Sequence, residues 1–259
     1  MRRRACLVSL VLLATLLAGT AGGQSASARL LMVTYSAGFQ HDAVRRGTAG
    51  TLSTAETVVA ELARRSGRFE VTHVATRAEL ERLTAAVVRA HSAILFFTSG
   101  ELPLAAAVRE ALLETVRDGA GFIGVHSAAD TWYAVREYHE LLGATFDGHP
   151  WHQRVRVIVE HLGHPATRHL GQAFEIADEI YQFRDWRRHD VHVLLRLDPR
   201  SVDIGRGKRA DGDYALAWTK SFGRGRVVYT ALGHELGVWA DERFKAHLLG
   251  AIEWALHQR

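Results

Sequence analysis

Three histidines follow apolar segments of the chain, and their side chains could do chemistry. His41 lies in the segment GFQHD, His126 follows the apolar run Gly121–Val125, and His234 follows the run Val227–Leu232. An imidazole titrates near neutral pH, so it can act as a general acid, a general base or a metal ligand. The chemistry available to this chain therefore depends on whether these side chains meet.

Acidic residues close to these histidines in the sequence could orient the imidazoles. Glu101 follows an apolar run, Asp130 comes soon after His126, and Glu235 directly follows His234. A carboxylate that accepts a hydrogen bond from an imidazole fixes the ring and raises its basicity. Asp130 also has a structural interpretation, as the N-cap of a helix.

The first half of the chain contains strand patterns that alternate with helix patterns. The predicted strands are Leu30–Tyr35, Phe69–Val74, Ala93–Thr98 and Gly121–Val125, and the predicted helices are Leu52–Ser66, Ala78–Ala90 and Leu104–Asp118. This alternation predicts an α/β fold with a doubly wound, mostly parallel sheet. Ligands of such folds bind outside the carboxyl ends of the strands. We therefore expect His41, His126 and His234 to share one rim of the sheet.

The second half of the chain is less regular and rich in strand patterns. The predicted elements are strands over Arg154–Glu160 and Val191–Leu197, a hairpin of Tyr214–Ser221 and Val227–Leu232 around a Gly-Arg-Gly turn, and a final amphipathic helix over Glu242–His257. Nothing marks a domain boundary. We interpret Ala144–Arg209 as a β-rich insertion over the sheet edge, and not as a separate domain.

The N-terminal segment predicts export. Three arginines, Arg2 to Arg4, precede an apolar run, and Ala26-Ser27-Ala28 fits the small-residue rule for cleavage. Residues 1–28 are therefore predicted to be a signal peptide, and residues 29–259 one domain of a periplasmic or extracellular protein. The apolar run is short for a membrane span, so we expect no stable membrane insertion after cleavage.

Composition excludes several classes of function. Loss of the three signal arginines lowers the formal net charge from +4 to +1, so the charge gives no support for nucleic-acid binding. Cys6 is the only cysteine and leaves with the signal, so the mature chain has no disulfide and no thiolate nucleophile. We predict no bound cofactor. A divalent metal held by histidines and a carboxylate remains an alternative, ranked below metal-free acid–base chemistry because its ligands would come from distant loops.

Many short stretches resemble the trehalose-utilisation (ThuA-like) family. They occur in order over nearly all of the mature chain: GFQHD at 38–42, FTSG at 97–100, GFIGVHSAADTWY at 121–133, FDGHP at 146–150, HPAT at 164–167, DEIY at 178–181, AWTK at 217–220 and GRVVYTALGH at 225–234. The resemblance implies a fold similar to class I glutamine amidotransferases, which is a flavodoxin-like three-layer sandwich. In those enzymes a cysteine occupies a strand-to-helix elbow, and a histidine followed by a carboxylate lies near the chain end.

This chain departs from the amidotransferase pattern at the elbow. His126 stands where the cysteine would be, and His234-Glu235 resembles the late pair. Because the mature chain has no cysteine, a thioester mechanism and glutaminase activity are excluded. The resemblance also implies a substrate class, because family members are linked to the catabolism of trehalose and related disaccharides, often beside dehydrogenases that make 3-keto sugars.

The sequence thus predicts an exported enzyme that acts on a disaccharide or keto-sugar by histidine acid–base chemistry. The predicted catalytic residues are His126 as base or acid, His234 as its counterpart, and Asp130 and Glu101 as orienting groups; the predicted substrate contacts are His41, His152, Tyr181 and Trp132. The expected partner is a small carbohydrate, and a homo-oligomer is compatible with the sequence. Two alternatives remain open at this point, namely a non-catalytic carbohydrate-binding protein and a zinc-dependent hydrolase.

Overall fold

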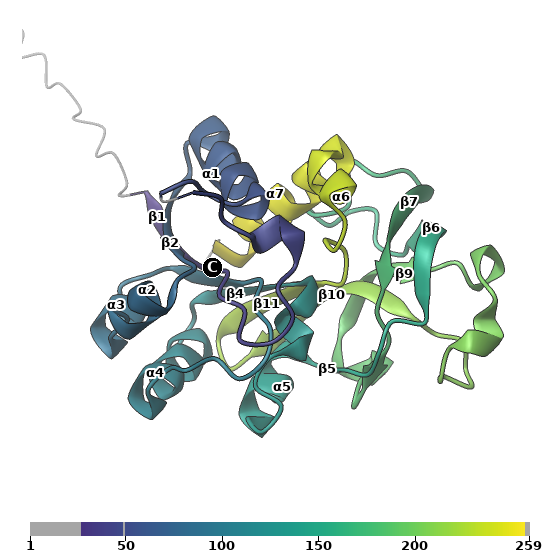
Figure 1. The fold of residues 1–259 in the computed structure, drawn as a ribbon. Helices are drawn as coiled ribbons and strands as arrows, with labels where there is room; N and C mark the ends of the chain where they lie inside the picture. Colours follow the sequence, from purple (N-terminus) through teal and green to yellow (C-terminus); the bar gives the residue numbers. More distant parts are fainter. Residues whose placement is uncertain (1–26, 49, 257–259) are drawn as a thin grey trace, which may run out of the picture.

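The computed structural model describes residues 27–48 and 50–256, which form a central sheet with helices on both faces (Figure 1). The predicted signal peptide lies outside the described residues, apart from Ser27 and Ala28. Ala28 is already the first residue of the first strand. None of the helices in the described ranges is long and apolar enough to cross a membrane.

The described residues contain a nine-stranded sheet in the order β2-β1-β3-β4-β11-β10-β9-β6-β7. The strands are β1 (Ala28–Val33), β2 (Phe69–Val74), β3 (Ala93–Phe96), β4 (Gly121–Val125), β6 (Trp151–Val159), β7 (Ala173–Ile180), β9 (His192–Leu197), β10 (Ala215–Phe222) and β11 (Gly225–Thr230). Neighbouring strands from β2 to β11 are parallel, and those from β11 to β7 are antiparallel. Two short strands, β5 (Thr145–Phe146) and β8 (Phe183–Arg184), form a separate pair.

Helices cover the two faces of the parallel half, as Figure 1 shows. One face carries α1 (Thr54–Ser66), α6 (Leu236–Ala240) and α7 (Glu242–Leu256), and the other carries α2 (Arg77–Glu81), α3 (Ala85–Arg89), α4 (Ala106–Arg117) and α5 (Arg136–Leu142). The predicted three-layer α/β sandwich is therefore confirmed. Its parallel strands are buried on both faces, which is why they read as continuous apolar runs in the sequence.

Strand β4 is the central support of the site. All five of its residues are buried. A Cβ atom on Gly121 would lie 2.6 Å from the carbonyl oxygen of Ala255 in α7, so glycine is needed for the helix to pack this closely. The strand therefore delivers its next residue, His126, at a fixed position.

Most of the predicted elements are present, with local differences that have physical causes. The helix predicted over Ala78–Ala90 is two helices, α2 and α3, because the Thr84 hydroxyl accepts a hydrogen bond from the Val87 amide and begins a new helix. Asp130, which could have been the N-cap of a helix, is instead the last residue of a 3₁₀ turn, η2 (His126–Asp130), and the N-cap of α5 is Val135. Strand β7 and helix α5 were not predicted.

The β-rich segment predicted over Ala144–Arg209 continues the central sheet. Its strands β6, β7 and β9 pair with one another, and β9 pairs with β10. Four strands separate β7 from β4 in the sheet order, yet Glu179 in β7 has its Oε2 atom 3.5 Å from Nε2 of His126. The antiparallel half must therefore curve back over the carboxyl ends of the parallel strands.

A buried histidine in α7 makes the stability of the fold sensitive to acid. His247 is 2% exposed and its Nδ1 atom lies 2.8 Å from the Ala166 carbonyl oxygen. Burial lowers the pKa of His247 to about 4. The unfolded chain binds this proton near pH 6.5 and the folded chain only near pH 4, so stability falls as pH decreases between those values.

We expect His247 to lower the free energy of unfolding by about 3 kcal/mol as the pH decreases from 6.5 to 4. In His247→Gln, which cannot titrate, the decline of unfolding free energy over that range should be smaller by this amount. Urea unfolding at several pH values measures the slope. His189→Gln, at an exposed histidine, is the control and should keep the wild-type slope; an unchanged slope in His247→Gln would contradict the prediction.

Candidate functional site

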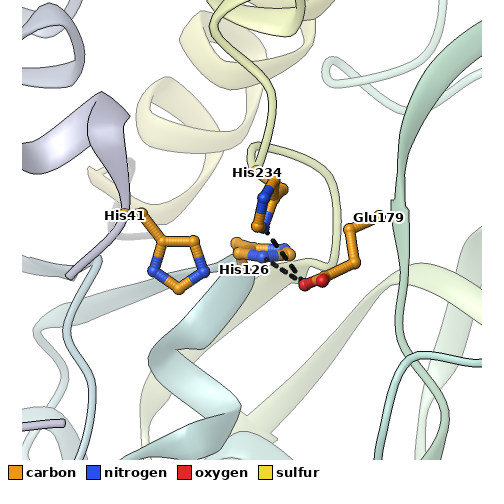
Figure 2. Close-up of side chains that lie close together, drawn as sticks. All are labelled: His41, His126, Glu179 and His234. Atoms are coloured by element: carbon orange, nitrogen blue, oxygen red, sulfur yellow. Dashed lines mark ion pairs between the residues drawn. The ribbon is translucent and has the colours of Figure 1, made fainter. Parts of the chain in front are cut away.

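The three histidines that the sequence placed at one rim meet in the structure, as Figure 2 shows. The ring centroids of His41 and His126 are 4.8 Å apart, those of His41 and His234 are 5.0 Å apart, and those of His126 and His234 are 5.4 Å apart. The rings come from the loop after β1, the end of β4 and the loop after β11. One site is thus assembled from three distant segments.

A fourth side chain, Glu179 from β7, completes the cluster (Figure 2). Its Oε2 atom lies 3.1 Å from Nδ1 of His234 and 3.5 Å from Nε2 of His126, and its Oε1 atom lies 3.2 Å from Nδ1 of His149. The Glu179 side chain is only 8% exposed. We call His41, His126, Glu179 and His234 the histidine–glutamate centre.

The loop that carries His41 is fixed by the end of β3. The Ser99 hydroxyl donates to the Phe39 carbonyl at 2.6 Å, and the Ser99 carbonyl accepts from the amides of Ala37 and Gly38. Gly100 has a φ of +72°, and a Cβ atom there would lie 2.5 Å from the Gly38 nitrogen. The Ser-Gly pair therefore allows the close contact that sets the position of His41.

His126 sits at a strained turn. Its φ is +45°, a left-handed conformation that non-glycine residues rarely adopt. The side chain is fully buried, and Nδ1 lies 2.6 Å from the Ala231 carbonyl oxygen. The Tyr229 hydroxyl donates to the His126 carbonyl at 2.7 Å. Strain of this kind persists where the surroundings fix it, and here it aims Nε2 at Glu179.

Asp178, next to Glu179, holds the loop that carries His234. Its buried carboxylate accepts hydrogen bonds from the amides of Gly233 at 2.7 Å and Glu235 at 3.0 Å. Burial raises the pKa of Asp178, against the effect of nearby His126 and of these backbone bonds. Of the two adjacent acids on β7, Glu179 contacts the histidines, and Asp178 holds the backbone on either side of His234.

The charges of the centre are strongly coupled. Burial acts to raise the pKa of Glu179, but the adjacent His126 and His234 outweigh it and hold that pKa well below its ordinary value. Glu179 in turn raises the pKa of His234. Burial lowers the pKa of His41 to about 3, and His126 and His234 add to this effect. The centre therefore combines an ionised carboxylate with at least one neutral imidazole at neutral pH.

The two predicted orienting carboxylates lie differently. Asp130 is half-buried, accepts a hydrogen bond from the Tyr133 hydroxyl, and lies close enough to His126 to interact electrostatically. Burial raises the pKa of Asp130. Glu101 is exposed, and within the described residues its side chain makes no hydrogen bond or ion pair. The structure therefore gives Glu101 no orienting contact with the histidines.

Two of the predicted substrate contacts are buried instead. Tyr181 is 2% exposed, and its ring lies against His126 with centroids 4.1 Å apart. Trp132 is 1% exposed, packs against Phe96 and Tyr138, and donates its indole N–H to the Leu102 carbonyl. Tyr181 therefore packs against a ring of the centre, and Trp132 packs against core aromatic rings.

Exposed side chains surround the centre on its solvent side. His152 is half-exposed and its Nε2 lies 2.5 Å from Oε1 of Glu235, while its ring centroid is 5.0 Å from that of His234. Phe39 is 64% exposed and stacks on His234 with centroids 6.4 Å apart. We call Phe39, His149, His152 and Glu235 the mouth of the site. It offers an apolar ring and several polar groups to a ligand.

Comparison with protein families agrees with the fold and the motifs. The family model described as "ThuA: Trehalose utilisation" matches residues 29–255. The chain belongs to the ThuA family. A comparison with curated proteins finds no match. The family resemblance of the sequence motifs is therefore confirmed.

Solved ThuA-like structures share the fold at low sequence identity. A putative ThuA-like protein from Bacteroides uniformis is 20% identical with a TM-score of 0.68, covering 91% of this chain and 94% of that one. One from Parabacteroides merdae is 16% identical with a TM-score of 0.70, covering 89% and 90%. A cytoplasmic protein from Salmonella typhimurium is 12% identical with a TM-score of 0.61, covering 88% and 99%. At these identities the likeness shows the fold alone.

The residue beside the elbow does not replace the missing thiol in this ThuA-family chain. Ser127 is 1% exposed, and its Oγ atom has no hydrogen-bond partner among the described residues. A serine nucleophile needs an adjacent base within hydrogen-bond reach. The available chemistry therefore lies in the three imidazoles and the one carboxylate of the centre and in Asp130.

Proposed function

We propose that this protein is an enzyme that transfers a proton from the carbon next to the ketone of a trehalose-type keto-sugar to the ketone carbon. The observation that carries the proposal is the convergence of three imidazoles on one buried carboxylate at the carboxyl edge of the sheet. The substrate class comes from the trehalose-utilisation family to which the chain belongs. A ketone acidifies the neighbouring C–H bond, so a positioned base suffices for the first step.

We propose Asp130, in place of His126, as the base. His126 is fully buried and its Nδ1 is engaged with Ala231, so its ring is poorly placed to reach a carbon of the substrate. Asp130 is partly accessible, and no hydrogen bond in the described residues reaches its second carboxylate oxygen. A raised pKa makes a carboxylate a stronger base. We assign proton removal to Asp130.

The reaction balances without a co-reactant. Asp130 takes the proton, the C–H electron pair forms a C=C bond to the ketone carbon, and the carbonyl pair moves onto oxygen. The histidine–glutamate centre stabilises the resulting enolate oxygen, which is the usual task of a preorganised polar site. Asp130 then returns its proton to the former ketone carbon. The hydroxyl group on the deprotonated carbon passes its own proton to the enolate oxygen and becomes the new ketone, so the product is an isomer of the substrate.

The mouth would bind the rest of the sugar. Phe39 presents an exposed ring face, and the His152–Glu235 pair presents hydrogen-bonding groups. We expect Phe39→Ala to raise KM for a keto-disaccharide by about 2–12-fold, since loss of one aromatic contact costs about 0.5–1.5 kcal/mol. Because Phe39 is exposed, its kcat should change by less than threefold. Steady-state kinetics separates the two; unchanged KM would remove Phe39 from the binding surface.

Deuterium exchange tests the proposed reaction directly. The protein is incubated in D₂O with 3-keto-trehalose, and with trehalose as the control that lacks a ketone. We expect deuterium at the carbon next to the ketone by NMR, and at least about 100-fold slower exchange in Asp130→Asn. Saturable sugar binding without exchange or product would support a non-catalytic carbohydrate-binding protein instead. Absence of both would overturn the substrate class.

Export is a separate proposal that rests on the N-terminal sequence. We propose that residues 1–28 are removed on secretion, which leaves Arg29 in β1 as the first residue. Mass spectrometry of the protein recovered from the periplasm or the medium of an expressing bacterium gives the N-terminus. Recovery of the intact chain from the cytoplasm only would contradict this proposal.

A further inference from the structure

We infer that the histidine–glutamate centre is a binding site for one divalent transition-metal ion of the zinc type. One ligand-type atom from each of its four side chains lies within 4.8 Å of all the others. Three imidazole nitrogens with one carboxylate oxygen suit Zn²⁺ and similar ions, whereas Mg²⁺ and Ca²⁺ prefer oxygen ligands. The site stands on this geometry; only the catalytic role of the ion rests on the proposed function.

The distances from the carboxylate to two of the imidazoles are those of ligands around one ion. Nitrogen and oxygen ligands lie about 2.1 Å from Zn²⁺, so two ligands separated by an angle of about 90–110° are about 3.0–3.4 Å apart. Glu179 Oε2 is 3.1 Å from His234 Nδ1 and 3.5 Å from His126 Nε2. These separations match to about 0.1 Å, so the carboxylate and the two rings need little movement to share an ion.

Two nitrogen atoms of the centre lack other partners. His126 Nε2 and His234 Nδ1 are buried and make no hydrogen bond with suitable geometry within the described residues. Both lie within ion-pair distance of Glu179, but not in hydrogen-bond alignment with it. Buried polar atoms are nearly always satisfied in native proteins. Two unsatisfied nitrogens beside one carboxylate, with the His41 ring turned toward them (Figure 2), indicate a shared cation.

The surroundings prepare His126 as a ligand. Its Nδ1 atom is 2.6 Å from a carbonyl oxygen, which can only accept, so Nδ1 carries the proton. In the neutral ring this leaves the lone pair on Nε2, the atom that faces Glu179. A hydrogen bond from the far ring nitrogen to a backbone carbonyl is the usual outer support of a metal-bound histidine.

A second group of donors at the mouth is the competing site. His152, His234 and Glu235 also lie within 4.8 Å of one another. However, His152 and Glu235 already satisfy each other at 2.5 Å, and both side chains are over 40% exposed. Variants at the mouth therefore serve as matched controls for variants in the centre. In the proposed reaction, the bound ion would supply the positive charge that stabilises the enolate oxygen.

Titration of EDTA-treated, dialysed protein with Zn²⁺ alone tests the site. Zinc is a suitable probe because it binds such donors more tightly than Mn²⁺ or Fe²⁺ does. Calorimetry should show one ion per chain with micromolar or tighter affinity. Glu179→Gln and His41→Gln should weaken binding by more than about 100-fold, since loss of an outer-shell partner already costs 10–100-fold. His152→Gln should stay within about threefold of wild type.

The outcomes distinguish this inference from the proposed function. Absence of one-to-one binding, or wild-type affinity in Glu179→Gln, would overturn the metal site. Weakened binding in His152→Gln with unchanged binding in Glu179→Gln would move the ion to the mouth and likewise overturn it. Undiminished deuterium exchange in the EDTA-treated protein would remove the catalytic role of the ion. Zinc binding without any exchange would support the site and count against the sugar chemistry alone.

Discussion

His126→Asn should lower kcat/KM for a keto-disaccharide by at least about 1,000-fold. The substitution removes the imidazole from the centre of the site, and loss of preorganised stabilisation of this kind typically costs 100-fold to 1,000-fold, with loss of the ion in addition. Asparagine suits the position because it tolerates the left-handed backbone found at φ +45°. Steady-state kinetics and deuterium exchange both measure the effect.

The control for this variant is a buried histidine away from the site. His91 is 8% exposed and bonds to Val87 and Thr72. His91→Asn also removes a buried imidazole, so it should lower stability while leaving kcat/KM within about threefold. Equal kinetic effects of the two variants would show that His126 acts only through the fold, and the assignment of the centre would fail.

Asp178→Asn should damage both stability and metal affinity. The carboxylate accepts from the amides of Gly233 and Glu235, and an amide side chain turns its own donor toward one of them. Losing charge-assisted bonds in a buried site should cost about 3–5 kcal/mol of unfolding free energy. Because these amides flank His234, zinc affinity should fall by about 10–100-fold. Asp178 is thus a positioning residue.

A second buried aspartate separates positioning from general destabilisation. Asp198 is 2% exposed and accepts bonds from Arg200, far along the chain from the centre's ligands. Asp198→Asn should lower stability without changing zinc affinity in the folded protein. Urea unfolding and calorimetry at a temperature where both variants are folded give the two values. Wild-type zinc affinity in Asp178→Asn would contradict the positioning role.

The parallel half of the fold could be predicted from the sequence because its strands are buried on both faces. Such strands are unbroken apolar runs, as in β4, and their alternation with helices fixes the topology. The rule that ligands sit at the carboxyl ends of strands then placed His41, His126 and His234 together. Strand β7 was missed, because its eight residues include Glu175, Asp178 and Glu179 and lack a clear apolar alternation.

Glu179 could not be predicted because its place depends on the curvature of the whole antiparallel half. The motif DEIY at 178–181 was a signal, but a motif alone assigns no role to either acid. Trp132 is a different case. Trp132 is close to His126 in the sequence, which suggested a substrate contact. Its backbone is left-handed, with a φ of +52°, and its side chain is buried in the core. Closeness in the sequence therefore does not predict the direction of this side chain, which depends on the backbone conformation.

The location of a bound ion would show whether the histidine–glutamate centre is a metal site. Crystals of the protein soaked in Zn²⁺ and measured at the zinc absorption edge would give an anomalous difference map. We predict one strong peak at about 2.0–2.3 Å from His126 Nε2, His234 Nδ1, a Glu179 oxygen and a ring nitrogen of His41. A peak at His152 and Glu235 instead, or no peak among the three histidines, would contradict a metal site at the centre.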